Sequence, residues 1–260
     1  MDIKEKFSII ILSCDKYSDL WKPFFNLFFR FWPDCPFPIM LVSNSKRFLR
    51  SGIKQLLVGP DKSWSDTLLT ALSNISTEYV LLMLEDIFLT SAVDTEVVIN
   101  NILWLDSRKG NYLRLNPTPK PVRKIDEEHG EAPPGSVYRT STVFCIWRKS
   151  VLEQLLVPGE SAWDFEIFGS VRSDIIPGFY ACIRPTFQYI NGVVKGKWSS
   201  WAVTLLKQRG VNLDLHARPI MGWCETVGLR LAIMRGLIYE LIPWKWRRLI
   251  KGWTRPMADK

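Results

Sequence analysis

Short apolar runs without helical spacing recur along the first 115 residues. The clearest runs lie at residues 7–12, 38–42, 80–84 and 112–115, and residues 55–58 form a weaker one. Runs of this kind are typical of strands buried on both faces of a parallel sheet. Helices are expected between them, at residues 20–31, 64–74 and 95–106. Strands that alternate with helices in this way predict an α/β fold with a doubly wound, mostly parallel sheet flanked by helices.

The run at residues 80–84 ends in two adjacent carboxylates, Glu85 and Asp86. Burying unpaired carboxylates costs several kcal/mol, so acids at the end of a buried strand require a reason. Open α/β folds bind ligands at the carboxyl edge of the sheet, where a hard cation or a polar ligand is the usual partner. The alternative is a solvated turn in which Asp86 caps a later helix. This stretch alone leaves both interpretations open.

Polar residues also follow the first predicted strand, from Ser13 to Tyr17. In a doubly wound fold this position lies beside a bound nucleotide. No glycine-rich fingerprint follows the strand, so the sequence supports neither a P-loop nor a dinucleotide site.

Residues 116–135 form a long polar loop that contains five prolines and His129. Loops of this length within a compact domain are usually lids or disordered segments. A strand-like run at residues 143–147 follows at once, which argues against a linker. We therefore expect a mobile lid, in which His129 is a solvated loop residue rather than a catalytic base.

Two further acids, Asp164 and Glu166, follow a predicted short helix at residues 150–156. On an extended segment both side chains would point the same way, whereas on a helix they would diverge. Either carboxylate suits a general base held near an acceptor hydroxyl. The alternative for each is an acid in the first turn of a helix.

The C-terminal residues predict two helical segments after a late hairpin at residues 187–198 and a helix at residues 198–209. Residues 227–242 are apolar on almost every side, and Pro243 starts the second segment. There Trp246, Leu249, Ile250 and Trp253 share one face, and Lys245, Arg247, Arg248 and Lys251 take the others. Tryptophan with lysine and arginine on a short amphipathic helix is typical of a helix lying on an anionic bilayer. The alternative is a helix packed on the body or on a partner.

Charge distribution supports this division of the chain. Of the net charge of +8, residues 226–260 carry +6, from eight Lys and Arg against Glu240 and Asp259. A basic tail on a near-neutral body favours an anionic surface over a nucleic-acid partner. We expect a domain at residues 1–225 and a membrane-associating tail at residues 226–260, with no nucleic acid bound.

The rarer residues exclude several other classes of protein. The five cysteines never form a CxxC spacing, which argues against a disulfide framework and a structural zinc site and favours a reducing compartment. Two histidines are too few for a multi-histidine metal centre. We also expect neither a signal peptide nor a spanning helix, and therefore a cytoplasmic protein held peripherally on the inner face of the membrane.

With these pieces placed, the sequence resembles the GT-A-fold glycosyltransferases, and most of all the small family-2-like enzymes of bacterial capsule and O-antigen clusters. The stretches that carry the resemblance are residues 13–17, Trp64-Ser65, residues 78–86 and residues 160–166. They span roughly residues 7–200 and leave the tail as an addition.

The resemblance implies roles for the residues at these positions. Asp86 would bind Mn²⁺ or Mg²⁺ that bridges the diphosphate of a nucleotide-sugar, with Glu85 as its partner. The sequence Glu85-Asp86-Ile87 stands where these enzymes commonly have an Asp-x-Asp motif. Nucleotide contacts are implied near four further residues: Ser13, Asp15, Asn44 and Trp64.

Inverting members of this fold use a later acid to deprotonate the acceptor hydroxyl. By similarity this general base is Glu166, narrowly preferred to Asp164. The resemblance then implies a hexosyltransferase-like enzyme that transfers a sugar to a lipid-linked or polysaccharide acceptor in surface polysaccharide biosynthesis. Two alternatives stay open: a non-catalytic scaffold or nucleic-acid-binding protein that uses the basic tail, and a metal-dependent nucleotidyltransferase.

Overall fold

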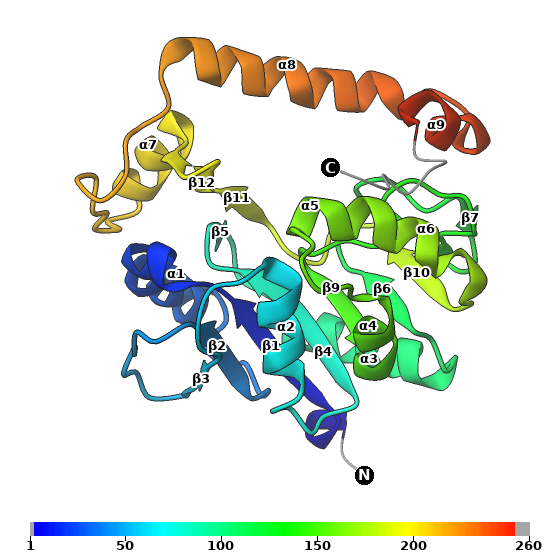
Figure 1. Ribbon diagram of the computed structural model, residues 1–260, viewed down its shortest axis with the longest axis horizontal. Helices are drawn as coiled ribbons and strands as arrows, with labels where there is room; N and C mark the ends of the chain where they lie inside the picture. Colours follow the sequence, from blue (N-terminus) through cyan, green and yellow to red (C-terminus); the bar gives the residue numbers. More distant parts are fainter. Residues whose placement is uncertain (1–2, 253–260) are drawn as a thin grey trace.

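A nine-stranded sheet forms the centre of the molecule (Figure 1). The structure is a computed structural model and describes residues 3–252, without the side chains of Lys4 and Leu237. The strand order is β3-β2-β1-β4-β9-β6-β10-β8-β7. Its strands are β1 (Phe7–Leu12), β2 (Ile39–Ser43), β3 (Ile53–Leu57), β4 (Tyr79–Leu84), β6 (Tyr112–Arg114), β7 (Arg123–Lys124), β8 (His129–Glu131), β9 (Cys145–Arg148) and β10 (Phe179–Cys182).

The sheet is mixed but mostly runs in one direction, as expected. β3, β2, β1 and β4 are parallel neighbours, and β6 and β10 form another parallel pair. β9 lies between the two groups and is antiparallel to both β4 and β6. The apolar run of residues 143–147 predicts a strand but not its reversed direction, because an apolar run carries no sign of orientation.

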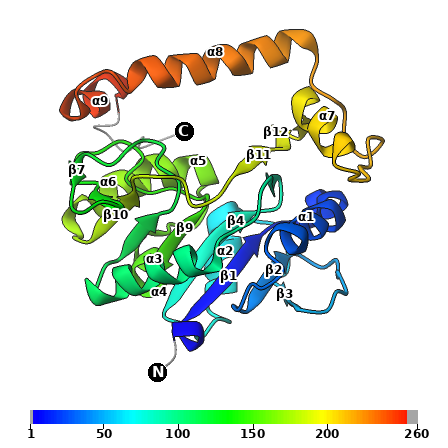
Figure 2. The ribbon, with the colours of Figure 1, turned by 180° about the vertical axis from the view of Figure 1, so that it is seen from behind.

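Helices cover both faces of the sheet (Figures 1 and 2). Ile9 and Ile11 of β1 share one core with α1, α3 and α7, whereas Ile10 and Leu12 share the other with α2 and α4. Successive side chains of a strand point to opposite faces, so one apolar strand serves both cores. The helices are α1 (Ser18–Phe31), α2 (Trp64–Leu72), α3 (Thr95–Ser107), α4 (Lys149–Leu155), α5 (Ala162–Asp164), α6 (Ser170–Arg172), α7 (Ser200–Gln208), α8 (Trp223–Tyr239) and α9 (Trp244–Lys251).

Shorter elements complete the described chain. A π-helical turn (Phe165–Gly169) joins α5 to α6, and 3₁₀ turns lie at Ile3–Glu5, Asp15–Tyr17 and Ser173–Ile175. β5 (Ile87–Leu89) pairs with β11 (Tyr189–Asn191), and β12 (Val193–Val194) pairs with β13 (Lys197–Trp198). The expected late hairpin is therefore present.

The expectation for residues 116–135 is wrong at His129. This segment adds β8 and β7 to the edge of the sheet, where β8 pairs with β10. His129 is buried, and its ring stacks on Trp104 with 3.9 Å between centroids. Its Nδ1 and Nε2 contact Asp126 Oδ1 at 3.0 Å and Asn101 Oδ1 at 2.8 Å. The composition of the loop gives no sign of this burial, because Trp104 and Asn101 lie on α3 and only Asp126 belongs to the same turn.

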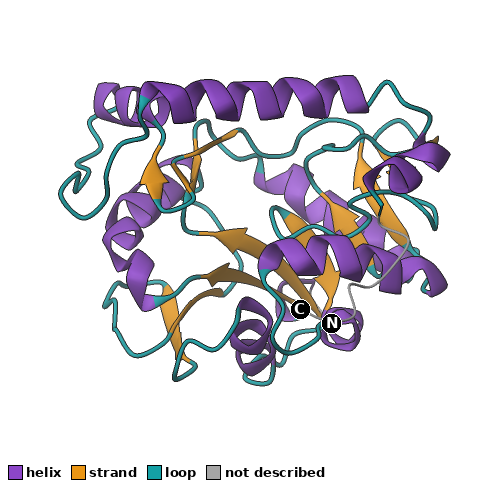
Figure 3. Cartoon of the chain, turned by 45° about the horizontal axis from the view of Figure 1, so that its top comes forward, coloured by secondary structure: helices purple, strands orange, loops and turns teal. Residues whose placement is uncertain are grey.

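The tail forms two helices, and α8 crosses the side of the molecule towards which β1 and β4 run, between α7 and α9 (Figures 1 and 3). On α9, Trp246, Leu249 and Ile250 are exposed, while Trp253 lies outside the described residues. Arg248 corrects the expected basic face, because it is buried against the body and pairs with Asp174. None of the helices within residues 3–252 combines the length and apolar character needed to cross a bilayer.

Candidate active site

The ends of β1 and β4 meet at the carboxyl edge of the sheet and form a pocket of about 220 Å³. Their parallel register pairs Leu12 with Leu84, so the residues that follow each strand lie side by side. The pocket is lined by Leu12, Ser13, Cys14, Tyr17, Asp61, Trp64, Thr67, Leu84, Glu85, Asp86 and Ala162. The structure therefore brings together four residues predicted as site residues: Ser13, Trp64, Glu85 and Asp86.

The two acids lie in an environment that disfavours their charged forms. Glu85 is buried, and its pKa is raised well above its ordinary value by burial and by the neighbouring Asp86. Burial also raises the pKa of Asp86, and Arg218 offsets part of the shift. Asp86 Oδ1 is buried and has no hydrogen-bond partner among the described residues. Unsatisfied buried acceptors are rare in folded proteins, so this oxygen points to a ligand.

The backbone of Asp86 is held by a segment distant in sequence. Gly192, between β11 and β12, donates its N–H to the Asp86 carbonyl at 2.8 Å. A Cβ atom at Gly192 would lie 2.1 Å from Cε2 of Phe88, so only glycine allows this close approach. The pairing of β11 with β5 thus sets the direction of the turn that carries both acids.

Trp64 supplies a second unsatisfied polar group to the pocket. Ser63 caps α2 by accepting a hydrogen bond from Asp66 N at 3.1 Å, which places Trp64 in the first turn. Its ring packs on Phe165 with 5.4 Å between centroids. Its indole Nε1 is buried without a partner among the described residues. This donor and the acceptor on Asp86 line the same pocket.

Asp15 and Asn44 brace the pocket instead of lining it. The Asp15 carboxylate accepts hydrogen bonds from the backbone N–H groups of Asn44, Ser45 and Lys46, at 3.0 to 3.1 Å. In return, Asn44 Oδ1 accepts from Asp15 N at 3.0 Å, and its Nδ2 donates to Gly59 O at 3.1 Å. These contacts join the turns that follow β1, β2 and β3.

Arg218 is a site-proximal residue that sequence reasoning missed. It is buried, forms a two-pronged ion pair with Asp19 at 2.8 Å for each contact, and donates to Lys16 O at 2.6 Å. Its guanidinium also lies 4.0 Å from the centroid of Tyr17, which lines the pocket. The loop after α7 is therefore fixed beside the acid pair, and no local sequence signal indicates this contact.

Asp164 and Glu166 diverge, as expected for a helix. Asp164 belongs to a capping box with Ser161, whose hydroxyl donates to its carboxylate at 2.6 Å. Glu166 Oε1 accepts from Thr142 N at 2.9 Å, Thr142 Oγ1 at 3.0 Å and Ser141 Oγ at 3.2 Å. Burial raises the pKa of Glu166, and these hydrogen bonds offset part of the shift. Neither carboxylate lines the pocket.

The carboxylates of Asp86 and Glu85 fit a divalent cation whose other coordination positions are filled by a bound substrate and water. Within residues 3–252, no group of three or more His, Cys, Asp or Glu side chains is arranged to hold a metal ion. Mg²⁺ is commonly bound by one or two carboxylates together with substrate phosphates and water. Asp86, with its unpartnered oxygen, and the adjacent Glu85 provide that number of carboxylates.

Comparisons with known proteins agree on the fold. No protein-family profile matches the chain, and no curated protein matches its sequence. TarS 1–349 from S. aureus in complex with UDP superposes with a TM-score of 0.50 and 15% identity, over 81% of this chain and 67% of that one. The mannosyltransferase PcManGT from Pyrobaculum calidifontis, in complex with GDP-Man and Mn²⁺, gives 0.50 and 12%, over 93% and 71%.

A further TarS 1–349 structure and the UTP-bound UGPase from Acinetobacter baumannii give TM-scores of 0.45 and 0.49. The chain spans 60% of that TarS 1–349 chain and 40% of the longer TarS chain. Sequence identities this low establish architecture and not activity. The chain therefore has a GT-A-like α/β fold, with a mixed, mostly parallel sheet between layers of helices.

Proposed function

We propose that this protein is a glycosyltransferase that binds a nucleotide-sugar in the pocket at the ends of β1 and β4. The observation that carries the proposal is the acid pair at the end of β4, in which Glu85 is buried and Asp86 Oδ1 lacks a partner among the described residues. Trp64, whose buried Nε1 also lacks a partner there, lines the same pocket. A nucleoside diphosphate with a divalent cation supplies what both groups lack, namely a cation for the carboxylate and an acceptor for the indole. The ligands in the TarS and PcManGT structures, UDP in one and GDP-Man with Mn²⁺ in the other, are of this class.

In this proposal Asp86 and Glu85 would hold Mn²⁺ or Mg²⁺, and the cation would supply the positive charge that neutralises the leaving diphosphate. Asp86 is the direct ligand, and Glu85 supports it from a buried position beside Ser13. Asp15 and Asn44 keep the surrounding turns in place. Trp64 lines the same pocket and contacts the nucleotide there.

Glu166 is our candidate for the general base, with Asp164 as the alternative. Burial makes the Glu166 carboxylate a better proton acceptor than an exposed one, because it raises the pKa. Its Oε1 accepts three hydrogen bonds, whereas Oε2 makes none among the described residues. The carboxylate of Asp164 is already engaged in its helix cap.

The acceptor in this proposal is a lipid-linked glycan of a surface polysaccharide, such as a capsule or O-antigen, on the inner face of the cell membrane. The support comes from the tail, in which α8 and α9 leave many large apolar side chains exposed. These side chains are Trp223, Leu231, Ile233, Met234, Ile238, Trp246, Leu249 and Ile250. Such a surface would hold the enzyme where a lipid-linked acceptor lies.

The test is a thermal-shift screen against UDP, GDP, CMP and dTDP, with and without Mn²⁺. A ligand that binds the folded state raises its stability, so one nucleotide should raise the Tm only when Mn²⁺ is present. Asp86→Asn should abolish this shift and leave the Tm without ligand unchanged or higher, because it removes a buried charge without changing the shape. Glu127→Gln, at an exposed acid between β7 and β8 and outside the pocket, is the matched control and should keep the full shift.

Two outcomes would redirect the proposal. If Asp86→Asn retained the full shift, the pocket would bind nucleotides without the acid pair. If the protein released pyrophosphate from a nucleoside triphosphate and a sugar phosphate, the nucleotidyltransferase alternative would replace glycosyl transfer.

A further inference from the structure

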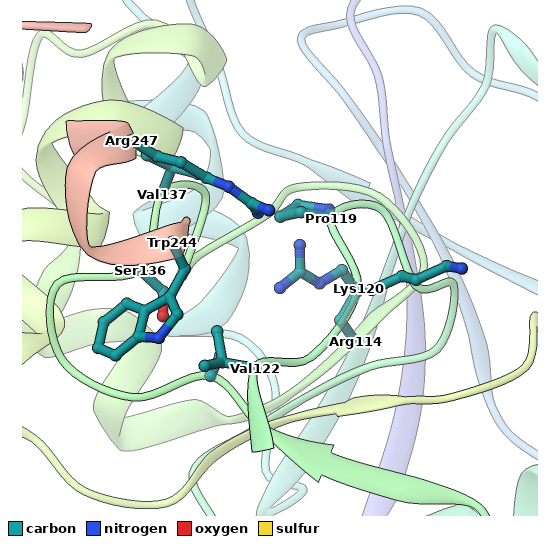
Figure 4. Close-up of a pocket in the computed structure, with 9 residues that line it drawn as sticks. Arg114, Pro119, Lys120, Val122, Ser136, Val137, Trp244 and Arg247 are labelled. Carbon is teal, nitrogen blue, oxygen red and sulfur yellow. The ribbon is translucent and has the colours of Figure 1, made fainter. Parts of the chain in front are cut away.

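A second cavity lies between the first turn of α9 and the loop that follows β6 (Figure 4). It is lined by Arg114, Pro119, Lys120, Val122, Ala132, Ser136, Val137, Trp244 and Arg247. These residues include three cationic side chains and no carboxylate. Figure 4 shows the guanidinium groups of Arg114 and Arg247 near Pro119, with Trp244 and Ser136 across from them, while Lys120 extends towards the rim.

Arg114 is the most unusual of these residues. Its side chain is only 2% exposed, yet it makes one hydrogen bond, from Nη1 to Thr118 O at 2.9 Å. Its Nε has no partner among the described residues, and no ion pair joins Arg114 to a carboxylate there. The Glu166 carboxylate attracts Arg114 but forms no ion pair with it among the described residues. A buried guanidinium whose Nε lacks an acceptor is costly, so this arrangement is stabilised when an anion supplies one.

The opposite wall adds a second unsatisfied group. Ser136 is 5% exposed, and its Oγ also lacks a hydrogen-bond partner in the described part of the chain. Arg247 donates from Nε to Ile242 O at 2.8 Å and from Nη2 to Glu240 O, which holds its side chain along the first turn of α9. The positive end of the helix therefore faces the same cavity.

The carboxylates near the cavity, Asp174 and Glu166, already have other hydrogen-bond partners. Asp174 pairs with Arg248 and accepts from Gly135 N at 2.9 Å, and the hydrogen-bonded oxygen of Glu166 faces residues 141 and 142. Burial lowers the pKa of the adjacent Arg139 to about 10, and Arg248 adds to the effect although Asp174 opposes it. The region beneath α9 thus contains more buried positive charge than its carboxylates balance.

We propose that this cavity is a phosphate-binding site, and that its ligand is the phosphate group of a membrane lipid or of a lipid-linked acceptor. The enclosed part measures about 10 Å³, room for about one water molecule. A phosphate group therefore binds at the mouth of the cavity, beside Arg247 and the exposed Lys120. The lipid is favoured as the source because Trp246, Leu249 and Ile250 of α9 are exposed next to the site. Only this choice of source rests on the proposed function.

The experiment compares phosphate from two sources. Sedimentation with vesicles of phosphatidylcholine, with and without phosphatidic acid, measures binding to a lipid phosphate, and calorimetry with inorganic phosphate measures binding to the free anion. The variants are Arg247→Gln, Lys120→Gln and Arg114→Gln. Lys245→Gln removes the same charge from the exposed side of α9 and is the matched control.

Losing one charge-assisted hydrogen bond should weaken binding to phosphatidic acid vesicles about tenfold in Arg247→Gln and in Arg114→Gln. Lys245→Gln should weaken binding clearly less than Arg247→Gln does, because it removes only one surface charge. Inorganic phosphate that binds and competes with the vesicles would support the same site with a free source. If Arg114→Gln does not fold, Arg247→Gln and Lys120→Gln decide the question.

The proposal is overturned if phosphatidic acid does not strengthen binding, or if Lys245→Gln weakens it as much as Arg247→Gln does. The nucleotide-dependent Tm shift is measured in the same variants and should stay unchanged. If the wild type showed no nucleotide-dependent Tm shift, the result would count against the proposed function but not against the phosphate site.

Discussion

At the scale of single residues, acids that are close in sequence differ in the partners that surround them. Glu85 and Asp86 follow an apolar run, which leaves open whether they are buried or lie in a solvated turn, and the structure buries Glu85 and half-buries Asp86. Asp164 and Glu166 carry no such local signal, because the partners of Glu166 lie more than 20 residues earlier, at 141 and 142. A sequence shows that an acid is present, whereas its environment depends on residues that the fold brings near.

The two candidate bases can be separated by matched amide substitutions. Glu166→Gln should lower kcat by roughly 10²-fold with little change in the donor KM, because a general base acts on the acceptor in the transition state. Asp164→Asn should retain most of its activity and lose about 1 kcal/mol of stability through the weakened helix cap. Steady-state kinetics and chemical denaturation of both variants check this prediction. The reverse pattern would assign the base to Asp164.

His129 makes stability depend on pH. Burial lowers its pKa, so the unfolded chain binds a proton more readily than the folded one. Stability should therefore fall as the pH drops through about 6.5, the ordinary histidine value, and be retained above it. Urea midpoints at pH 7.5 and 5.5 should show this loss in the wild type, and His129→Gln should flatten it. A loss that survived in His129→Gln would point to other groups.

At the scale of elements, the long apolar parallel strands follow from the sequence, whereas the short antiparallel pairings do not. β1, β2 and β4 are apolar on both faces, and that pattern predicts their place in the centre. β5 and β11 are three residues each and pair across about 100 residues of chain, which no local pattern indicates. The turn at Asp86 is nevertheless shaped by that pairing.

Gly192 tests how closely β11 must approach the acid pair. Gly192→Ala places a Cβ atom 2.1 Å from Phe88 Cε2, so Phe88 or the backbone must move. We expect a loss of about 1–3 kcal/mol in stability, as for other overpacked sites, and a weaker Mn²⁺-dependent nucleotide shift. Denaturation and thermal-shift curves measure both. Gly228→Ala on α8, where nothing lies within 4 Å of the new Cβ, is the control and should not destabilise the fold.

At the scale of the whole molecule, the body and the tail expose different kinds of surface. The body buries most of its aromatic residues in two cores, although Trp163 and Trp201 are exposed. By contrast, α8 and α9 present tryptophan and several aliphatic side chains outward. Composition predicts an amphipathic tail, and the structure shows which face of α9 packs against the body. The docked face of α9 is the one that carries Arg248, because its guanidinium finds backbone carbonyls and Asp174 beneath it.

The exposed face of α9 should therefore mediate attachment to a bilayer. The double variant Trp246→Ser and Ile250→Ser should lose most of its sedimentation with lipid vesicles and keep its Tm, because both side chains are about 60% exposed. Leu103→Ser, at a 47% exposed position of α3 in the body, is the control and should sediment as the wild type does. Equal losses in both variants would place the contact surface elsewhere.

The buried Arg248 has a further consequence for how attachment responds to ionic strength. A charge paired beneath the helix is shielded from the solvent and adds little to long-range attraction, whereas an exposed lysine such as Lys245 is screened within about 10 Å at 0.1 M salt. Attachment that rests mainly on tryptophan and isoleucine should accordingly persist in concentrated salt. The tail would then attach to the bilayer mainly through hydrophobic contacts, and it would stay bound at salt concentrations that release purely basic peptides.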